Sequence, residues 1–112
     1  MDNELAGIET EMKRGFLQLL GLVVLEKEAY GYAMVRAFRE LGYEVEENTL
    51  YPLLRRLEKR GLVEGKWEVG EERPRKFYAV TKAGRELRRE LLAIWDRQDE
   101  IIRRTVKESK NA

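Results

Sequence analysis

The chain of 112 residues contains no cysteine and no histidine. Without cysteine there are no disulfides, thiolate nucleophiles or cysteine-ligated metal ions, and without histidine the usual general base and the commonest metal ligand are missing. These absences exclude most classes of enzyme and most metal sites. We therefore predict that the protein is not an enzyme and that it uses neither a cofactor nor a metal ion.

Long hydrophobic runs are also missing. The longest apolar run covers residues 16–25 and is interrupted by Gln18, which is far short of the roughly 20 residues that span a bilayer. The N-terminus carries Asp2 and Glu4 and lacks the basic segment of a secretory signal. We expect a cytoplasmic protein that does not associate with a membrane.

Neither sign of charge dominates, because the chain has 22 basic and 21 acidic residues and a net charge of +1. The charges are nevertheless separated along the chain. Residues 26–47 carry six acidic and three basic side chains, residues 48–60 carry one acidic and four basic, and residues 71–89 carry three acidic and seven basic. The near-neutral total therefore conceals two basic segments in the second half of the chain.

Hydrophobic periodicity predicts helices in the first half. Residues 12–25 are good helix material with apolar side chains around nearly the whole circumference, which requires cover on two sides. Thr10 is a candidate cap, and we expect residues 1–11 to form a frayed acidic lead-in. A second, short helix follows in residues 33–41 and ends at Gly42.

A third helix is indicated by leucines at positions 50, 53, 54 and 57, which recur at the spacing of one helical face. Proline is tolerated in the first turn, so Pro52 places the start near Asn48 or Thr49, both competent caps. Gly61 is expected to end this helix.

The period then changes to that of a strand. Residues 63–69 alternate between apolar and charged side chains, residues 70–74 supply a turn, and residues 75–80 form a return strand, which together predict a β-hairpin. We expect Trp67 on the inner face of this hairpin and residues 26–30 as a polar connection. Thr81 caps a long final helix that reaches about residue 107.

Three helices followed by a hairpin is the order of a winged helix-turn-helix. The predicted fold class is mainly α with a small antiparallel β-hairpin (α+β), a winged helix-turn-helix with a long C-terminal dimerisation helix. We expect a single domain over residues 1–112, with the winged helix-turn-helix core in residues 12–80 and the dimerisation helix in residues 81–109.

The face of the third helix opposite its leucines is cationic and rich in hydrogen-bonding groups. It contains Asn48, Pro52, Arg55 and Lys59, with Tyr51 and Arg56 on its flanks. Such a face displaces counterions from phosphates, and its arginine, lysine and asparagine side chains match guanine and adenine edges. A solvated surface is the alternative for a charge run alone, but the basic hairpin that follows favours DNA.

Four motifs in order carry a resemblance to a known family. They are KRGFLQLL (residues 13–20), YGY (30–32), TLYPLLRRLE (49–58) and PRKFY (74–78), followed by Thr81 and Gly84. These motifs closely resemble the PadR-like transcriptional regulators. The resemblance implies a dimeric winged-helix repressor that binds operator DNA and is often released by a small effector. It also implies DNA contacts at Thr49, Tyr51, Pro52 and Arg55 on the recognition helix and at Arg73, Arg75 and Lys76 on the wing.

The chain departs from the family pattern near the recognition helix. Asn48 stands where glycine is usual, Glu46 where serine is frequent, and Tyr30 where histidine is frequent. Asparagine tolerates a left-handed backbone and caps helices, so the turn is expected to be preserved. Glu46 and Glu47 would repel phosphate at this end of the footprint. Tyr51 either donates to a phosphate or packs against the second helix.

A homodimer is predicted to bury apolar side chains of the first and last helices. The interface set is Phe16, Leu20, Leu87, Leu91, Ile94, Trp95, Ile101 and Ile102. Trp95 either packs in this interface or stacks on a small aromatic or apolar effector. Arg88, Arg89, Arg103 and Arg104 are expected to keep the arm soluble.

Two-fold symmetry predicts an approximately palindromic operator in double-stranded DNA, with half-sites about 34 Å apart or a multiple of that. Two alternatives stay open. One is a winged-helix protein-protein interaction module that does not bind DNA, and the other is a small-molecule sensor whose DNA contact is secondary.

Overall fold

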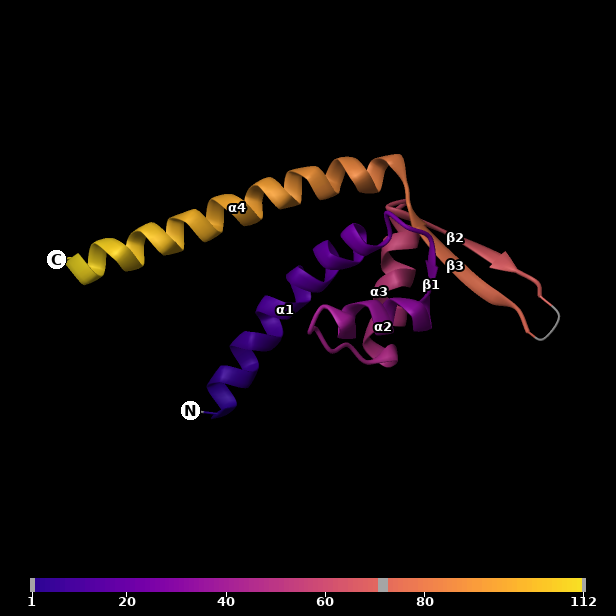
Figure 1. Cartoon of the computed structure of the whole chain (residues 1–112), viewed down its shortest axis with the longest axis horizontal. Helices are drawn as coiled ribbons and strands as arrows, with labels where there is room; N and C mark the ends of the chain where they lie inside the picture. Colours follow the sequence, from indigo (N-terminus) through magenta and orange to yellow (C-terminus); the bar gives the residue numbers. More distant parts are fainter. Residues whose placement is uncertain (1, 71–72, 112) are drawn as a thin grey trace.

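The computed structural model describes residues 2–70 and 73–111. In these residues four helices and three short strands form an elongated molecule of 65 × 33 × 24 Å (Figure 1). The predicted fold class, mainly helical with a small antiparallel sheet, is confirmed. The elements are α1 (Asp2–Val24), β1 (Ala29–Tyr30), α2 (Gly31–Glu40), α3 (Glu47–Lys59), β2 (Val63–Glu68), β3 (Arg75–Val80) and α4 (Lys82–Asn111).

The core lies where α1, α2, α3 and the sheet meet. The four leucines predicted for the inner face of α3 are all buried, and they pack with Leu22 and Leu25 from the α1 end and with Phe38 from α2. The predicted helix ends at Gly42 and Gly61 are also confirmed, because both glycines have positive φ angles, 86° and 74°, which is the conformation that ends a helix and favours glycine.

The first helix begins at Asp2, so the expected frayed lead-in and the cap at Thr10 are wrong for the described residues. Thr10 lies inside α1, where its hydroxyl donates to the carbonyl of Ala6 at 2.7 Å. The helix extends because residues 4–11 contain good helix formers, and an acidic first turn is favourable at the positive end of the helix dipole. Leu5, Ile8 and Met12 are exposed along this half of α1.

The third helix begins at Glu47, slightly earlier than the sequence predicts. Neither Asn48 nor Thr49 caps it, since Glu46 is the N-cap residue and makes no side-chain capping bond. Pro52 is consequently the sixth helical residue and not part of the first turn. A proline there cannot donate to the carbonyl of Asn48, and the exposed position of Asn48 leaves that carbonyl to water.

The sheet has the strand order β1-β3-β2, and β1 was not expected from the sequence. Residues 26–30 were predicted as a polar connection, but Ala29 pairs with Tyr78 and Tyr30 with Phe77. A strand of two residues is too short to show an alternating pattern. Its pairing depends on how the end of α1 is held against β3, where the Val80 amide donates to the Leu25 carbonyl at 3.0 Å.

The hairpin of β2 and β3, called the wing below, extends away from the helices (Figure 1). Its base is buried through Val63 and Tyr78. Trp67 was expected on a buried inner face, but this expectation is wrong because 66% of its surface is exposed. The alternation of the strand continues past the end of the core, so it brings Trp67 to the correct face without anything to cover it. Residues 71–72 of the predicted turn lie outside the described residues.

The last helix begins at Lys82, and Thr81 caps it as predicted, since its hydroxyl accepts the Gly84 amide at 3.0 Å and donates to the Gly61 carbonyl at 2.7 Å. The helix continues to Asn111, beyond the expected end.

Arg88 on α4 does more than keep the helix soluble. Its guanidinium donates to the Leu22 carbonyl at 3.2 Å and to the Glu26 carboxylate at 2.8 Å, and this bond satisfies a carbonyl near the end of α1.

The long helices α1 and α4 approach each other near the C-terminal end of α1 and diverge towards the two chain ends (Figure 1). None of the described helices combines the length and the apolar character that crossing a bilayer requires.

Candidate nucleic-acid interface

The outward face of α3 presents the residues that the helical periodicity predicts. Asn48, Thr49, Arg55, Arg56 and Lys59 are exposed, and Tyr51 and Pro52 are half-buried. Because α3 buries its leucines against the core, its cationic side chains are directed away from the body. The sequence prediction of a cationic outer face on α3 is confirmed.

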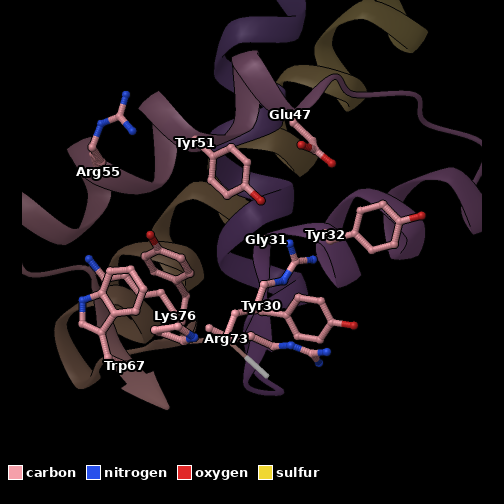
Figure 2. A pocket seen from close by; sticks show the side chains of 12 residues that line it. Tyr30, Gly31, Tyr32, Glu47, Tyr51, Arg55, Trp67, Arg73 and Lys76 are labelled. Carbon is pink, nitrogen blue, oxygen red and sulfur yellow. The ribbon is translucent and has the colours of Figure 1, made fainter. Parts of the chain in front are cut away.

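A cleft of about 810 Å³ separates α3 and the start of α2 from the wing (Figure 2). Five of the predicted contact residues line it together, namely Tyr51, Arg55, Arg73, Arg75 and Lys76. The cleft therefore brings side chains of the recognition helix and of the wing to one place.

A second groove, of about 470 Å³, lies on the other flank of α3. It is lined by Asn48, Thr49, Pro52 and Arg56 together with residues of α1 and of the loop before α3. Lys59 lines neither cavity. The predicted recognition-helix residues are thus divided between two sides of α3.

An aromatic ring restrains Arg75, one of the basic side chains of the cleft. The guanidinium of Arg75 lies 5.0 Å from the ring centre of Tyr30, and that ring packs edge-on against Phe77 at 5.5 Å. A cation over an aromatic face is attracted by the ring quadrupole, so Arg75 is restrained at the edge of the cleft. Arg36 lies in the same way 5.5 Å from the ring of Tyr32.

Lys76 differs from the other wing cations because an acidic residue binds it. Its ammonium donates to the carboxylate of Glu58 at 2.8 Å. This hydrogen bond is the main reason that the pKa of Lys76 is raised above its usual value, while partial burial acts in the opposite direction. The ammonium is therefore engaged within the protein, and the wing contact to DNA that the resemblance implies for Lys76 stays a prediction.

Tyr51 lies at the centre of the cleft in Figure 2, with Glu47 and Tyr32 nearby. Its burial, followed by the charge of Glu47, raises the pKa of its phenol above the usual 10.0. The hydroxyl therefore stays protonated at neutral pH and remains a hydrogen-bond donor.

Sequence reasoning missed the aromatic residues Tyr30, Tyr32 and Trp67 as parts of this site. The usable signal was the pair of tyrosines around Gly31, the first residue of α2. Trp67 was assigned to the core, and the alternation of its strand gave no sign that the core ends before it.

The residues predicted for a dimer interface fall into two groups. Leu20, Leu87 and Leu91 are half-buried against the core of their own chain. Phe16 lies between Tyr43 and Trp95, with ring centres 5.2 Å apart in both pairs. The others remain exposed: Ile94 at 39%, Trp95 at 46%, Ile101 at 48% and Ile102 at 63%.

Within the described part of the chain, no three acidic side chains gather as a metal site would require. The three-helix core, the wing and the exposed cationic face of α3 define a winged helix-turn-helix protein.

Comparison with known proteins identifies the family. Residues 19–90 match the Transcriptional regulator PadR-like family. The chain is similar to a PadR family transcriptional regulator from Eggerthella lenta, with 38% identity, a TM-score of 0.86 and 94% of each chain covered. It is also similar to Transcriptional regulator Rv3488 from Mycobacterium tuberculosis, with 38% identity over 60 residues that cover 54% of this chain and 56% of Rv3488.

A third relative is Bacillus subtilis PadR, whose crystal structure is a complex with operator DNA. It is 27% identical, with a TM-score of 0.65, over 69% of this chain and 45% of that protein. The chain therefore belongs to the PadR-like family of transcriptional regulators. As a member of this family it is a regulator of transcription and not an enzyme.

Proposed function

We propose that this chain is a sequence-specific DNA-binding regulator that acts as a homodimeric repressor and is released from its operator by a small aromatic or apolar effector. The observation that carries the DNA-binding part is the joint position of Arg55 on α3 and of Arg73 and Arg75 on the wing around one cleft. The operator complex of the Bacillus subtilis relative supports the same assignment.

The course of one DNA strand follows from this geometry. When a winged helix inserts its recognition helix into the major groove and its wing beside the adjacent minor groove, the strand between the two grooves lies between helix and wing. In this molecule that strand would run through the cleft. Arg55 would contact its phosphates from α3, Arg73 and Arg75 from the wing, and Tyr51 through its hydroxyl.

Base recognition is proposed for the exposed face of α3. Arg55 or Lys59 would read guanine and Asn48 would read adenine in the major groove, because these side chains match the hydrogen-bonding edges of those bases. Thr49, Pro52 and Arg56 would contact the backbone on the other flank of α3, where they line the second groove. Glu47, which lines the cleft, would keep phosphate away from the start of α3.

A second copy of the chain is proposed to cover the exposed apolar side chains of α1 and α4. Leu5, Ile8 and Met12 are 60–71% exposed on α1, and a matching set is exposed on α4. Because the two helices diverge towards the chain ends (Figure 1), these side chains remain exposed within the single chain. The proposed α4 set is Leu92, Ile94, Trp95, Ile101, Ile102 and Val106.

The effector is proposed to bind beside Trp95. This ring packs on Phe16 on one side and is still nearly half-exposed, so a second copy that covers α4 would enclose an apolar space next to it. The test uses the fluorescent probe 1-anilinonaphthalene-8-sulfonate in a Trp67→Phe background. Binding should quench Trp95 emission and weaken the affinity for DNA. Quenching without any effect on DNA affinity would argue against an effector at this position.

The proposed DNA binding is tested by selection of bound fragments from a random duplex pool. We expect an enriched, approximately palindromic sequence and an affinity that falls steeply with salt concentration. No enrichment and no salt dependence would favour the protein-protein interaction module instead. Repression is tested by placing the selected sequence across a promoter, where occupancy should lower transcription of a reporter gene.

A further inference from the structure

An ion pair joins the wing to α3. Lys76, near the start of β3, donates to Glu58, the penultimate residue of α3, at 2.8 Å. The side chains are only 25% and 31% exposed, so water screens this pair less than a fully exposed one. We call this pair, with the glycine beneath it, the latch.

Gly65 on β2 makes room for the latch. A Cβ atom at this position would lie 2.5 Å from Cε of Lys76 and 2.8 Å from Oε2 of Glu58, closer than van der Waals contact allows. Any side chain at position 65 would therefore displace one partner. The missing side chain lets the lysine stem cross β2 and reach α3.

Two aromatic rings on the wing further restrain the ammonium of Lys76. It lies 5.8 Å from the ring centre of Trp67, its cross-strand partner, and 5.4 Å from that of Tyr78. Cation–π attraction to both rings and the charged hydrogen bond to Glu58 hold the same atom. The latch thus links β2, β3 and α3 at one point.

Beyond the latch, the described residues of the wing have no apolar packing to orient them. From Trp67 towards the tip, every described residue is exposed, including Arg73 and Arg75. The buried base of the wing lies further back, at Val63, Tyr78 and Val80. The stacking of Arg75 on Tyr30 holds this part of the wing beside β1, and the latch ties it to α3, so the latch contributes to the angle between the wing and α3.

We propose that Glu58 and Lys76 are positioning residues that set this angle, so that Arg73 and Arg75 meet the same DNA strand as Arg55. This inference rests on the proposed function. It also explains an acidic side chain close to a surface that binds a polyanion. The charge of Glu58 is neutralised by Lys76 and serves to orient the wing.

The substitution Glu58→Gln separates this role from a direct phosphate contact by Lys76. Removing one negative charge near DNA should raise affinity, as should the release of Lys76 from its partner. A positioning role gives the opposite sign. We expect affinity for the selected duplex to fall roughly fivefold, the size typical of one lost hydrogen bond. Unchanged or increased affinity would overturn the proposal.

Glu64→Gln is the matched control, because Glu64 is an exposed acid on β2 and its loss changes the net charge by the same amount. We expect its affinity to be unchanged or slightly higher. A loss equal to that of Glu58→Gln would overturn the proposal. Melting curves of both variants establish that each is folded at the temperature of the titration.

A double-mutant cycle adds a second criterion. Lys76→Met and Glu58→Gln break the same contact, so the double variant should bind about as weakly as either single variant. If Lys76 contacted phosphate independently of Glu58, the two effects would be opposite in sign and additive, and the latch would be excluded.

A readout without DNA distinguishes failure of the latch from failure of the proposed function. In a Trp95→Phe background, Trp67 is the remaining tryptophan of the chain. The fluorescence anisotropy of Trp67 should fall in Glu58→Gln and not in Glu64→Gln, because a released wing moves more freely. If no duplex is selected by the wild-type protein, DNA binding is disproved while this measurement still decides the latch. Unchanged anisotropy of Trp67 in Glu58→Gln would disprove the positioning role of the latch.

Discussion

The ring of Tyr51 lies directly against the Cα atom of Gly31. A Cβ atom at position 31 would come within 2.8 Å of both Cζ and the hydroxyl oxygen of Tyr51. Gly31 is the first residue of α2 and Tyr51 lies within α3. The absent side chain therefore allows the recognition helix to pack its tyrosine on the start of the preceding helix and to form the floor of the cleft.

Gly31→Ala should push Tyr51 out of this position. We expect the free energy of unfolding to fall by about 1–3 kcal/mol, the usual effect of overpacking, and the affinity for DNA to fall as well. Urea unfolding and DNA titration measure the two effects. Gly15→Ala is the control, because no atom lies within 4 Å of the added Cβ and alanine favours a helix over glycine by up to about 1 kcal/mol. Equal stability of the two variants would refute the tight contact.

Arg55→Ala should weaken operator binding by roughly 1–3 kcal/mol. If Arg55 contacts a phosphate, the slope of log affinity against log salt should become shallower by about one. If it contacts a base, preference among sequences should decrease instead. Arg104→Ala, on the exposed surface of α4, removes the same charge and should have little effect. Wild-type affinity in a titration of Arg55→Ala would remove this residue from the interface.

Arg88→Met should loosen the attachment of α4 to α1. The substitution keeps the apolar stem but removes the bonds to the Leu22 carbonyl and to Glu26. We expect a loss of about 1–2 kcal/mol in the free energy of unfolding, because a partly buried carbonyl loses its partner. Arg89→Met, at an exposed neighbouring position, should be nearly neutral. The same stability in both variants would mean that the hydrogen bonds of Arg88 contribute nothing to the free energy of unfolding.

Affinity for DNA should be independent of pH between about 6 and 9 and should fall above about pH 10. The chain has no histidine to titrate near neutrality. The pKa of Tyr51 is raised in the folded protein, so the stability linked to its phenolic proton is present below the unfolded pKa of about 10 and is lost as the pH rises through the folded value.

Above that value the Tyr51 phenolate would also repel phosphate. Tyr51→Phe should therefore bind more weakly at neutral pH, through loss of the donor, and lose less affinity at alkaline pH than the wild type. Fluorescence anisotropy of a labelled duplex at constant ionic strength measures both. A severalfold change of wild-type affinity between about pH 6 and 9 would show that another group controls binding.

Ile102→Asp should convert the proposed dimer into a monomer. The side chain is 63% exposed in the single chain, and a carboxylate at a dry interface would be strongly unfavourable. Light scattering after size exclusion gives the mass directly. Ala93→Asp introduces the same charge at an exposed position on the opposite side of α4 and should leave the mass unchanged. If Ile102→Asp also leaves the mass unchanged, the exposed apolar side chains of α4 do not form the contact between two copies.

Most elements of the fold were predictable because their signals are local. The leucine spacing of α3, the helix ends at Gly42 and Gly61, and the cap at Thr81 each involve residues only a few positions apart. The extension of α1 was missed because its acidic start was interpreted as frayed. The strand β1 was missed because two residues are too few for a period, and its partner is nearly fifty positions away.

The candidate site was only partly predictable. Periodicity identified the outer face of α3, and the basic hairpin indicated wing contacts. The sequence pattern did not indicate that Glu58 binds Lys76, that Arg75 lies over the ring of Tyr30, or that Trp67 is exposed. Each of these facts depends on the angle between the wing and the helices.

The amino-acid sequence alone sufficed to predict the order of the four helices and of the hairpin, the buried side of α3 and its cationic opposite side, and to exclude histidine and cysteine chemistry. These properties depend on residue type and on spacing within one or two turns. Only the tertiary structure decided which basic side chains meet at the cleft, which one is bound by an acid, and that Arg88 holds the end of α1. Such contacts join residues far apart in the chain, so they exist only once the packed core has set the distances between elements.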